Sequence, residues 1–190
     1  MRGCSGLIVF MAAIACATLA GPAVAAATGK AVVDVQRDGE TFRVDATLFA
    51  PVPLDVAWDV LTDFDGMARF VPNIAMSRVV SRDGNRVTIE QRGLARFGPL
   101  AFGFTSERLI ELAPRSEIRS IQTRGNMRRL ESMTRFGTEE GGTTLVYRVE
   151  VEPGALYPAA LTERFLRDEI GEQFEAIVRE MVRRHGARAR

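Results

Sequence analysis

The longest amphipathic stretch of the sequence, residues 158–184, most constrains how this chain of 190 residues folds. Apolar side chains recur in it at intervals of three to five residues, so they share one face of a helix. Pro158 suits the first helical position, and Gly186 suits the point at which the helix stops. Such a helix is about 40 Å long, and its apolar face requires a large apolar partner. That face consists of Leu161, Phe165, Ile170, Phe174, Ile177 and Met181, widened by Leu166, Val178 and Val182.

Strand signals fill most of the chain before this helix and indicate what its partner is. A two-residue turn at 38–39 joins the first two strands, and its spacing places Val35 opposite Phe42. A helical segment follows at 53–72, and then about six strands run from 74 to 152. The turns between these strands are short, which requires antiparallel neighbours.

The beginning of the chain has the features of a secretory signal peptide. Arg2 precedes an apolar run at 7–19, and Ala23-Val24-Ala25 fits the rule of small residues at a cleavage site. The apolar run is short for a membrane span. A retained anchor and a lipoprotein modified at Cys16 are the alternatives. We expect signal residues 1–25 to be cleaved near Ala25 and the protein to be exported to the periplasm or secreted, with 26–190 as a single domain.

The composition of the mature chain excludes several kinds of active site. Both cysteines, Cys4 and Cys16, would leave with the signal, and His185 is the only histidine. Without a second histidine or a cysteine, zinc sites and Ser-His or Cys-His relays are excluded. We therefore expect no metal, no cofactor and no such catalytic residues. Arg2 would leave with the signal, so 24 Lys and Arg residues would balance the 24 Asp and Glu residues, and no basic patch indicates nucleic acid.

Residues 50–72 resemble the opening of polyketide cyclase and START-like (SRPBCC) domains. In those domains a strand leads into a helix with the pattern V-W-x-x-L-x-D, for which Trp58, Leu61 and Asp63 stand here, and then into the turn F-x-P, here Phe70-Val71-Pro72. The sequence is most similar to the coenzyme Q-binding START branch, also described as polyketide cyclase/dehydrase and lipid transport. The resemblance extends over about 40–184. It implies an α+β helix-grip fold, in which a curved antiparallel sheet of about seven strands surrounds the C-terminal helix and leaves a cavity.

One strand supplies the clearest polar candidates for that cavity. From Phe102 onward its residues alternate, so Ser106 and Arg108 share a face with apolar side chains. A buried guanidinium without partners is costly, so Arg108 meets an acid, water or a ligand oxygen unless a bulge turns it outward. Tyr147 lies among apolar residues of the last strand, either as a second ligand contact or as a core tyrosine with a satisfied hydroxyl. The predicted ligand-binding residues are Phe70, Phe102, Phe104, Ser106, Arg108, Tyr147 and Phe165.

Two apolar turns indicate where such a cavity opens. Residues 96–100 are unusually apolar for a hairpin tip, and 154–157 precede the long helix. Together they predict the mouth of a cavity or a transient contact with a membrane, while ordinary packing on a neighbouring loop is the alternative.

Three functions are compatible with these patterns. The leading hypothesis is a non-catalytic, exported binder or carrier of a hydrophobic small molecule that is lipid- or quinone-like. The first alternative is a cyclase or dehydratase acting on a polyketide-like substrate, which needs a positioned acid or base such as Arg108, Tyr147, Glu90 or Asp63. The second is a protein-interaction module with a filled core and no ligand. The sequence leaves the oligomeric state open.

Overall fold

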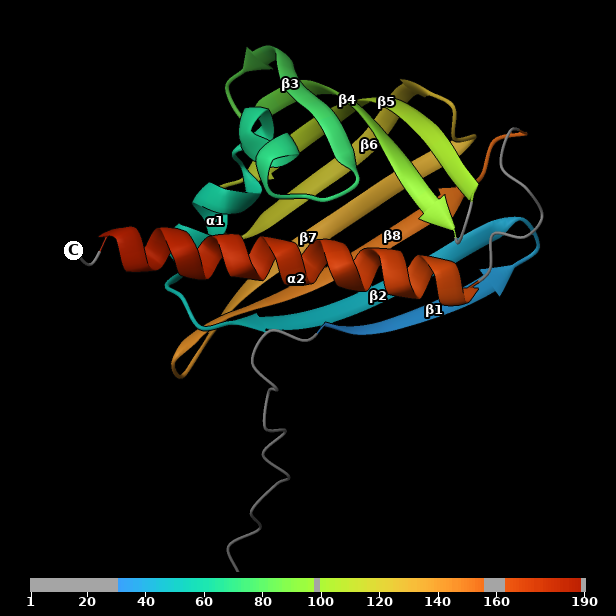
Figure 1. Cartoon of the computed structure of the whole chain (residues 1–190). Helices are drawn as coiled ribbons and strands as arrows, with labels where there is room; N and C mark the ends of the chain where they lie inside the picture. Colours follow the sequence, from blue (N-terminus) through green and yellow to red (C-terminus); the bar gives the residue numbers. More distant parts are fainter. Residues whose placement is uncertain (1–30, 98–99, 156–162, 189–190) are drawn as a thin grey trace, which may run out of the picture.

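The computed structural model describes residues 31–97, 100–155 and 163–188. Over these residues, eight strands form one antiparallel sheet in the order β1-β2-β8-β7-β6-β5-β4-β3 (Figure 1). The strands are β1 (Val32–Asp38), β2 (Thr41–Ala50), β3 (Ile74–Asp83), β4 (Arg86–Phe97), β5 (Leu100–Ala113), β6 (Glu117–Gly125), β7 (Arg129–Glu139) and β8 (Gly142–Glu152). The helices are α1 (Leu54–Leu61), the 3-10 helix η1 (Phe64–Arg69) and α2 (Glu163–Arg188).

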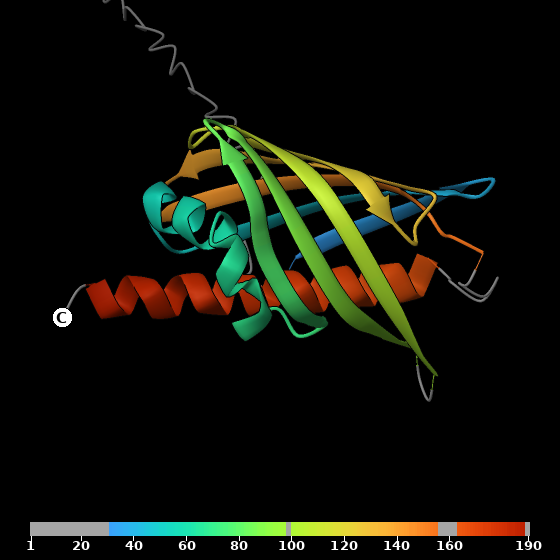
Figure 2. The ribbon, with the colours of Figure 1, turned by 90° about the horizontal axis from the view of Figure 1, so that it is seen from above.

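The sheet curves around α2. In the view of Figure 1, α2 runs in front of the sheet, with β3 to β5 above it and β1 and β2 below it. Figure 2 shows the same sheet arching over the helix, with α1 and η1 beside the C-terminal half of α2. The predicted α+β helix-grip fold is therefore confirmed, with eight strands described instead of about seven.

The register of the first hairpin differs from the predicted one. The two turn residues are Gly39 and Glu40, so Val35 pairs with Val44 instead of Phe42. Gly39 has a φ of +60°, which glycine adopts without steric cost and which suits the first position of this turn. The shift is an even number of residues. Because side chains alternate with a period of two, Phe42 and Val44 keep the buried face that the sequence predicted.

The long helix differs from the prediction at its C-terminal end. It continues through Gly186 to Arg188 instead of stopping at Gly186, and Arg188 Nη2 lies 2.7 Å from Asp59 Oδ2 of α1. This ion pair holds the last turn against α1. Val182 is 45% exposed and does not belong to the buried stripe, and the predicted start at Pro158 lies outside the described residues. No helix among the described residues is both long and apolar enough to cross a membrane.

Two groups of buried apolar residues hold α2 against the sheet. The larger group joins α1, α2 and the middle of the sheet, with Met181 fully buried and the rings of Trp58 and Phe136 5.3 Å apart. The smaller group joins β1, β2 and β8, with Leu166 and Ile170 of α2 packed against it. Residues from both groups also line the space described next.

Candidate functional site

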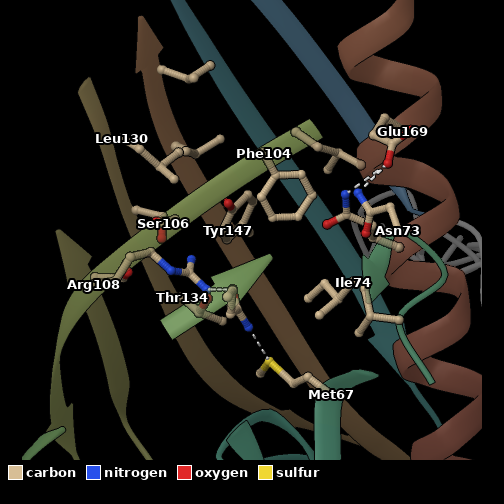
Figure 3. Close-up of a pocket in the computed structure, with 18 of the residues that line it drawn as sticks. Met67, Asn73, Ile74, Phe104, Ser106, Arg108, Leu130, Thr134, Tyr147 and Glu169 are labelled. Carbon is tan, nitrogen blue, oxygen red and sulfur yellow. Dashed lines mark hydrogen bonds between the residues drawn. The ribbon is translucent and has the colours of Figure 1, made fainter. Parts of the chain in front are cut away.

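A cavity of about 290 Å³ lies between α2 and the concave face of the sheet (Figure 3). Its lining is mostly apolar, as is usual for sites that bind small molecules. The polar side chains form two groups on different walls. We call the first the arginine pole; it consists of Gln91, Ser106, Arg108, Ser120, Ser132, Thr134 and Tyr147, all on strands. We call the second the glutamate pole; it consists of Asn73, Glu169 and Gln173.

Strand alternation in β5 directs Arg108 into the cavity, together with Phe104 and Ser106. The sequence left open whether a bulge turns Arg108 toward solvent. A register shift does occur there, but the additional residue, Thr123, belongs to the neighbouring strand β6. Arg108 therefore keeps the inward orientation that Figure 3 shows.

The guanidinium of Arg108 has little compensation for its burial. Its Nη2 donates a hydrogen bond to Gln91 Oε1, while its buried Nε has no hydrogen-bond partner among the described residues. No carboxylate of the described residues forms an ion pair with it. Burial lowers the pKa of Arg108, and Tyr147 partly offsets that effect. An arginine remains charged in proteins, so the cavity wall carries a cation whose hydrogen-bond partner among the described residues is a neutral amide.

Gln91 orients this cation and was not predicted from the sequence. It is 3% exposed, and its Nε2 donates to Ser77 Oγ at 3.0 Å and lies 3.3 Å from Met67 Sδ. With Nε2 so engaged, Oε1 faces Arg108. Alternation along β4 could have found Gln91, because it follows the buried Ile89 at a spacing of two.

Serine and threonine hydroxyls extend the arginine pole over three strands. Ser120 pairs with Ser132 across β6 and β7, and Thr134 lies on the same face of β7. The Oγ atoms of Ser106 and Ser120 are buried without a hydrogen-bond partner among the described residues. Such orphaned hydroxyls are uncommon in folded proteins. They leave hydrogen-bonding capacity free beside Arg108.

Tyr147 completes the arginine pole and is also part of the core. Burial raises the pKa of its hydroxyl, while Arg108 and a hydrogen bond with Ser132 lower it. Its ring packs edge-on against Phe174, with centroids 5.0 Å apart. Tyr147 is therefore a neutral phenol that is hydrogen-bonded to Ser132 and still lines the cavity.

The glutamate pole joins α2 to the turn before β3. Asn73 Nδ2 and Gln173 Nε2 both donate to Glu169 Oε1, the latter at 3.3 Å. Burial raises the pKa of the Glu169 carboxyl and the nearby Glu172 raises it further, against the effect of the two hydrogen bonds. The Oδ1 atom of Asn73 is buried and has no partner among the described residues. None of these three residues was predicted from the sequence.

The cavity lining contains five of the seven predicted ligand-binding residues, namely Phe104, Ser106, Arg108, Tyr147 and Phe165. Whether they bind a ligand stays a prediction. Phe70 does not line the cavity, because its ring packs under the guanidinium of Arg184, 5.5 Å from the ring centroid. Phe102 is also absent from the lining, which begins two residues further along β5 at Phe104. The tips of the two apolar turns, 98–99 and 156–157, lie outside the described residues.

Comparison with known proteins agrees with this geometry. The model of the family "Polyketide cyclase / dehydrase and lipid transport" matches residues 50–178. The chain belongs to this family. The fold of the family binds hydrophobic small molecules or lipids, and the predicted START-like membership is thereby confirmed. The finer assignment to a coenzyme Q-binding branch stays a prediction. Comparison with curated proteins gives no match.

Several solved structures have the same fold. The protein TTHA0849 from Thermus thermophilus has a TM-score of 0.64 and 19% identity, over 78% of this chain and 99% of its own. The STAR-related lipid transfer protein from Xanthomonas axonopodis has a TM-score of 0.59 and 11% identity, over 79% and 98%. The Zhui aromatase/cyclase from a Streptomyces strain has a TM-score of 0.56 and 19% identity, over 79% and 96%. Identities this low establish the shared fold alone.

Proposed function

We propose that this protein is a non-catalytic binder or carrier of a small hydrophobic molecule whose acidic or carbonyl end binds Arg108. The observation that carries the proposal is the Arg108 guanidinium, which lines a mostly apolar cavity. Among the residues that the structure describes, it has one neutral hydrogen-bond partner, and its Nε is unpaired. A carboxylate, enolate or carbonyl oxygen of a ligand would accept hydrogen bonds there, and a charged acceptor makes such bonds stronger. Burial of the apolar part would supply about 25 cal/mol per Å² removed from water.

The size of the cavity limits the class of ligand. Small-molecule sites in proteins have volumes of about 300–1,000 Å³, so a cavity of about 290 Å³ is at the small end of that range. A single medium-length chain or a small ring system suits this volume. The two long acyl chains of a membrane phospholipid exceed it. The lipid- or quinone-like ligand proposed here therefore has one chain or a compact ring.

The test compares an acid with the matching alcohol. Decanoate and decanol differ at one end only, so their affinities isolate the contribution of Arg108. We expect Arg108→Met to weaken decanoate binding at least tenfold and decanol binding much less. Arg92→Met is the matched control, because Arg92 is on neighbouring strand β4, its side chain is 62% exposed, and it pairs with Glu90. Equal affinity of both compounds for the unaltered protein would contradict the proposal.

We also propose that the protein acts outside the cytoplasm. The support is the apolar run at 7–19 followed by Ala23-Val24-Ala25, which has the form of a cleavable signal. N-terminal sequencing of the protein from periplasmic and culture fractions should give a chain that starts near Ala26. An uncleaved chain that stays in the cytoplasm would contradict export.

A second candidate function, cyclase or dehydratase activity, rests on the arrangement of Tyr147 and Arg108. They line the same cavity and affect each other's pKa, so a phenol proton donor stands beside a cation that stabilises an enolate. Incubation with a poly-β-keto thioester analogue tests this reaction. Product formation that Tyr147→Phe abolishes, with binding retained, would favour the enzyme. The third hypothesis, an interaction module, required a filled core, and the cavity gives it no support.

A further inference from the structure

The glutamate pole faces the same cavity as Arg108 but from the opposite wall. Glu169 and Gln173 project from α2, and Asn73 precedes β3. In Figure 3, Arg108 lies at one side of the cavity and Glu169 with Asn73 at the other, with the ring of Phe104 between them. A ligand that reaches from Arg108 along the apolar lining therefore ends against a second polar group.

The hydrogen bonds of the glutamate pole leave a defined set of atoms for a ligand. The two amide nitrogens of Asn73 and Gln173 both donate to Glu169 Oε1, and Glu169 Oε2 accepts neither of these bonds. Asn73 Oδ1 is buried and lacks a donor among the described residues. The atoms that remain for a ligand, Asn73 Oδ1 and Glu169 Oε2, are therefore both hydrogen-bond acceptors. Burial raises the pKa of the Glu169 carboxyl.

These atoms favour a neutral donor over an anion. A hydroxyl group donates one hydrogen bond, so it can donate to Asn73 Oδ1 beside the Glu169 carboxyl. A carboxylate would face the acceptor Oδ1 and the acidic Glu169, and like charges in a buried site repel strongly. A methyl group would leave Asn73 Oδ1 unpaired, which costs binding free energy.

We propose that the ligand is bipolar, with an acidic or carbonyl end at Arg108 and a neutral hydroxyl at the opposite end, held by Asn73 Oδ1 and Glu169. The proposal rests on the binding function proposed above and specifies its substrate class, an apolar hydroxy acid or hydroxy ketone. The two poles have separate roles: Arg108 selects the acidic end, and the glutamate pole selects what the far end carries.

The experiment measures the affinities of three matched series with chains of eight to twelve carbons. The series are plain fatty acids, ω-hydroxy fatty acids and α,ω-dicarboxylic acids, measured by displacement of a fluorescent apolar probe. At the chain length that spans the cavity, the hydroxy acid should bind about three- to tenfold more tightly than the plain acid, which is the range expected for one buried hydrogen bond. The dicarboxylic acid should bind more weakly than the plain acid.

Variants separate this inference from the function on which it rests. Asn73→Leu should reduce the ratio of hydroxy-acid to plain-acid affinity to one or below. Arg108→Met should weaken both acids and leave their ratio unchanged. If plain acids bind but the hydroxy acid binds no more tightly at any chain length, the proposal of a bipolar ligand is wrong, while the proposed binding function is retained. If no acid binds at any length, both proposals fail. Tighter binding of the dicarboxylic acid than of the plain acid would also contradict the proposal that the far end of the ligand is neutral.

Discussion

Gln91 holds Arg108 inside the cavity by a single hydrogen bond, from the Nη2 of the arginine to the Oε1 of the amide. Both side chains belong to the inner face of the sheet, on neighbouring strands β4 and β5. A neutral amide offsets the desolvation of a guanidinium only in part. We therefore expect Arg108 to lower the stability of the ligand-free protein, as functional groups in binding sites often do.

Removal of the charge should stabilise the ligand-free protein. Arg108→Met keeps an unbranched apolar stem and removes a buried cation that has no ion-pair partner among the described residues, so we expect the free energy of unfolding to rise by about 1 kcal/mol. Urea denaturation of the ligand-free protein measures this change. Arg92→Met, at an exposed ion pair, should change stability by less than about 1 kcal/mol. A clear loss of stability in Arg108→Met would show that the guanidinium is structural.

Removal of the amide should have the opposite effect. Gln91→Leu takes the acceptor from Arg108 and the donor from Ser77, so the free energy of unfolding should fall by about 1–3 kcal/mol. Adding Arg108→Met to this variant should restore most of the loss, because no cation is then left unpaired. Denaturation of the two single variants and the double variant measures the coupling. Strictly additive effects would contradict the link between the two side chains.

Glu169 should make stability depend on pH in the range above the pKa of an ordinary carboxyl. Its folded-state pKa is raised, mainly by burial, so its contribution is fully favourable below the unfolded-state pKa and is lost as pH rises through the folded-state pKa. Glu169→Gln, which cannot ionise, should therefore raise the melting temperature at pH 7 and change it little at pH 3. Thermal melts at both pH values measure this difference. A lower melting temperature of Glu169→Gln than of the unaltered protein at pH 7 would show that the folded protein stabilises the ionised Glu169 carboxylate.

Glu180 should show the opposite dependence at the other end of α2. Two hydrogen-bonded arginines, Arg183 and Arg184, lower its pKa from 4.5 to about 2. Its stabilisation is therefore present above about pH 4.5 and is lost as pH falls toward 2. Glu180→Gln should cost about 1 kcal/mol at pH 7, because Arg183 is 66% exposed and solvent screens the pair. Acid titrations of the two proteins should converge near pH 2.

Part of the arginine pole could be predicted from the sequence, because alternation along a single strand is a local property. The spacing of Ser106 and Arg108 from Phe104 was sufficient to place all three on one face of β5. Gln91 was not predicted, although the buried Ile89 two residues before it on β4 gives the same signal. Strand faces are predictable whenever one face is buried.

Other features depend on contacts between distant elements, which local patterns do not encode. Glu169 and Asn73 are 96 residues apart and meet only because the turn before β3 packs beside α2. Phe70 was predicted to bind the ligand, but its ring is covered by the guanidinium of Arg184, which is far away in the sequence. The size of the cavity depends on how strongly the sheet curves, and that curvature follows from twist accumulated over many strands.

Filling the cavity should separate ligand binding from folding. Ser120 is 5% exposed, lines the cavity and has a buried Oγ without a partner among the described residues. Ser120→Leu removes that unsatisfied hydroxyl and places a larger apolar side chain in the open space, so stability should stay the same or rise by about 1 kcal/mol. The affinity for decanoate should fall at least tenfold, because the leucine occupies volume that the chain requires.

Ser81→Leu, at an exposed position of β3, is the control for the chemical change and should leave binding unaltered. Undiminished decanoate binding by a folded Ser120→Leu protein would place the ligand outside this cavity and would contradict the carrier proposal directly.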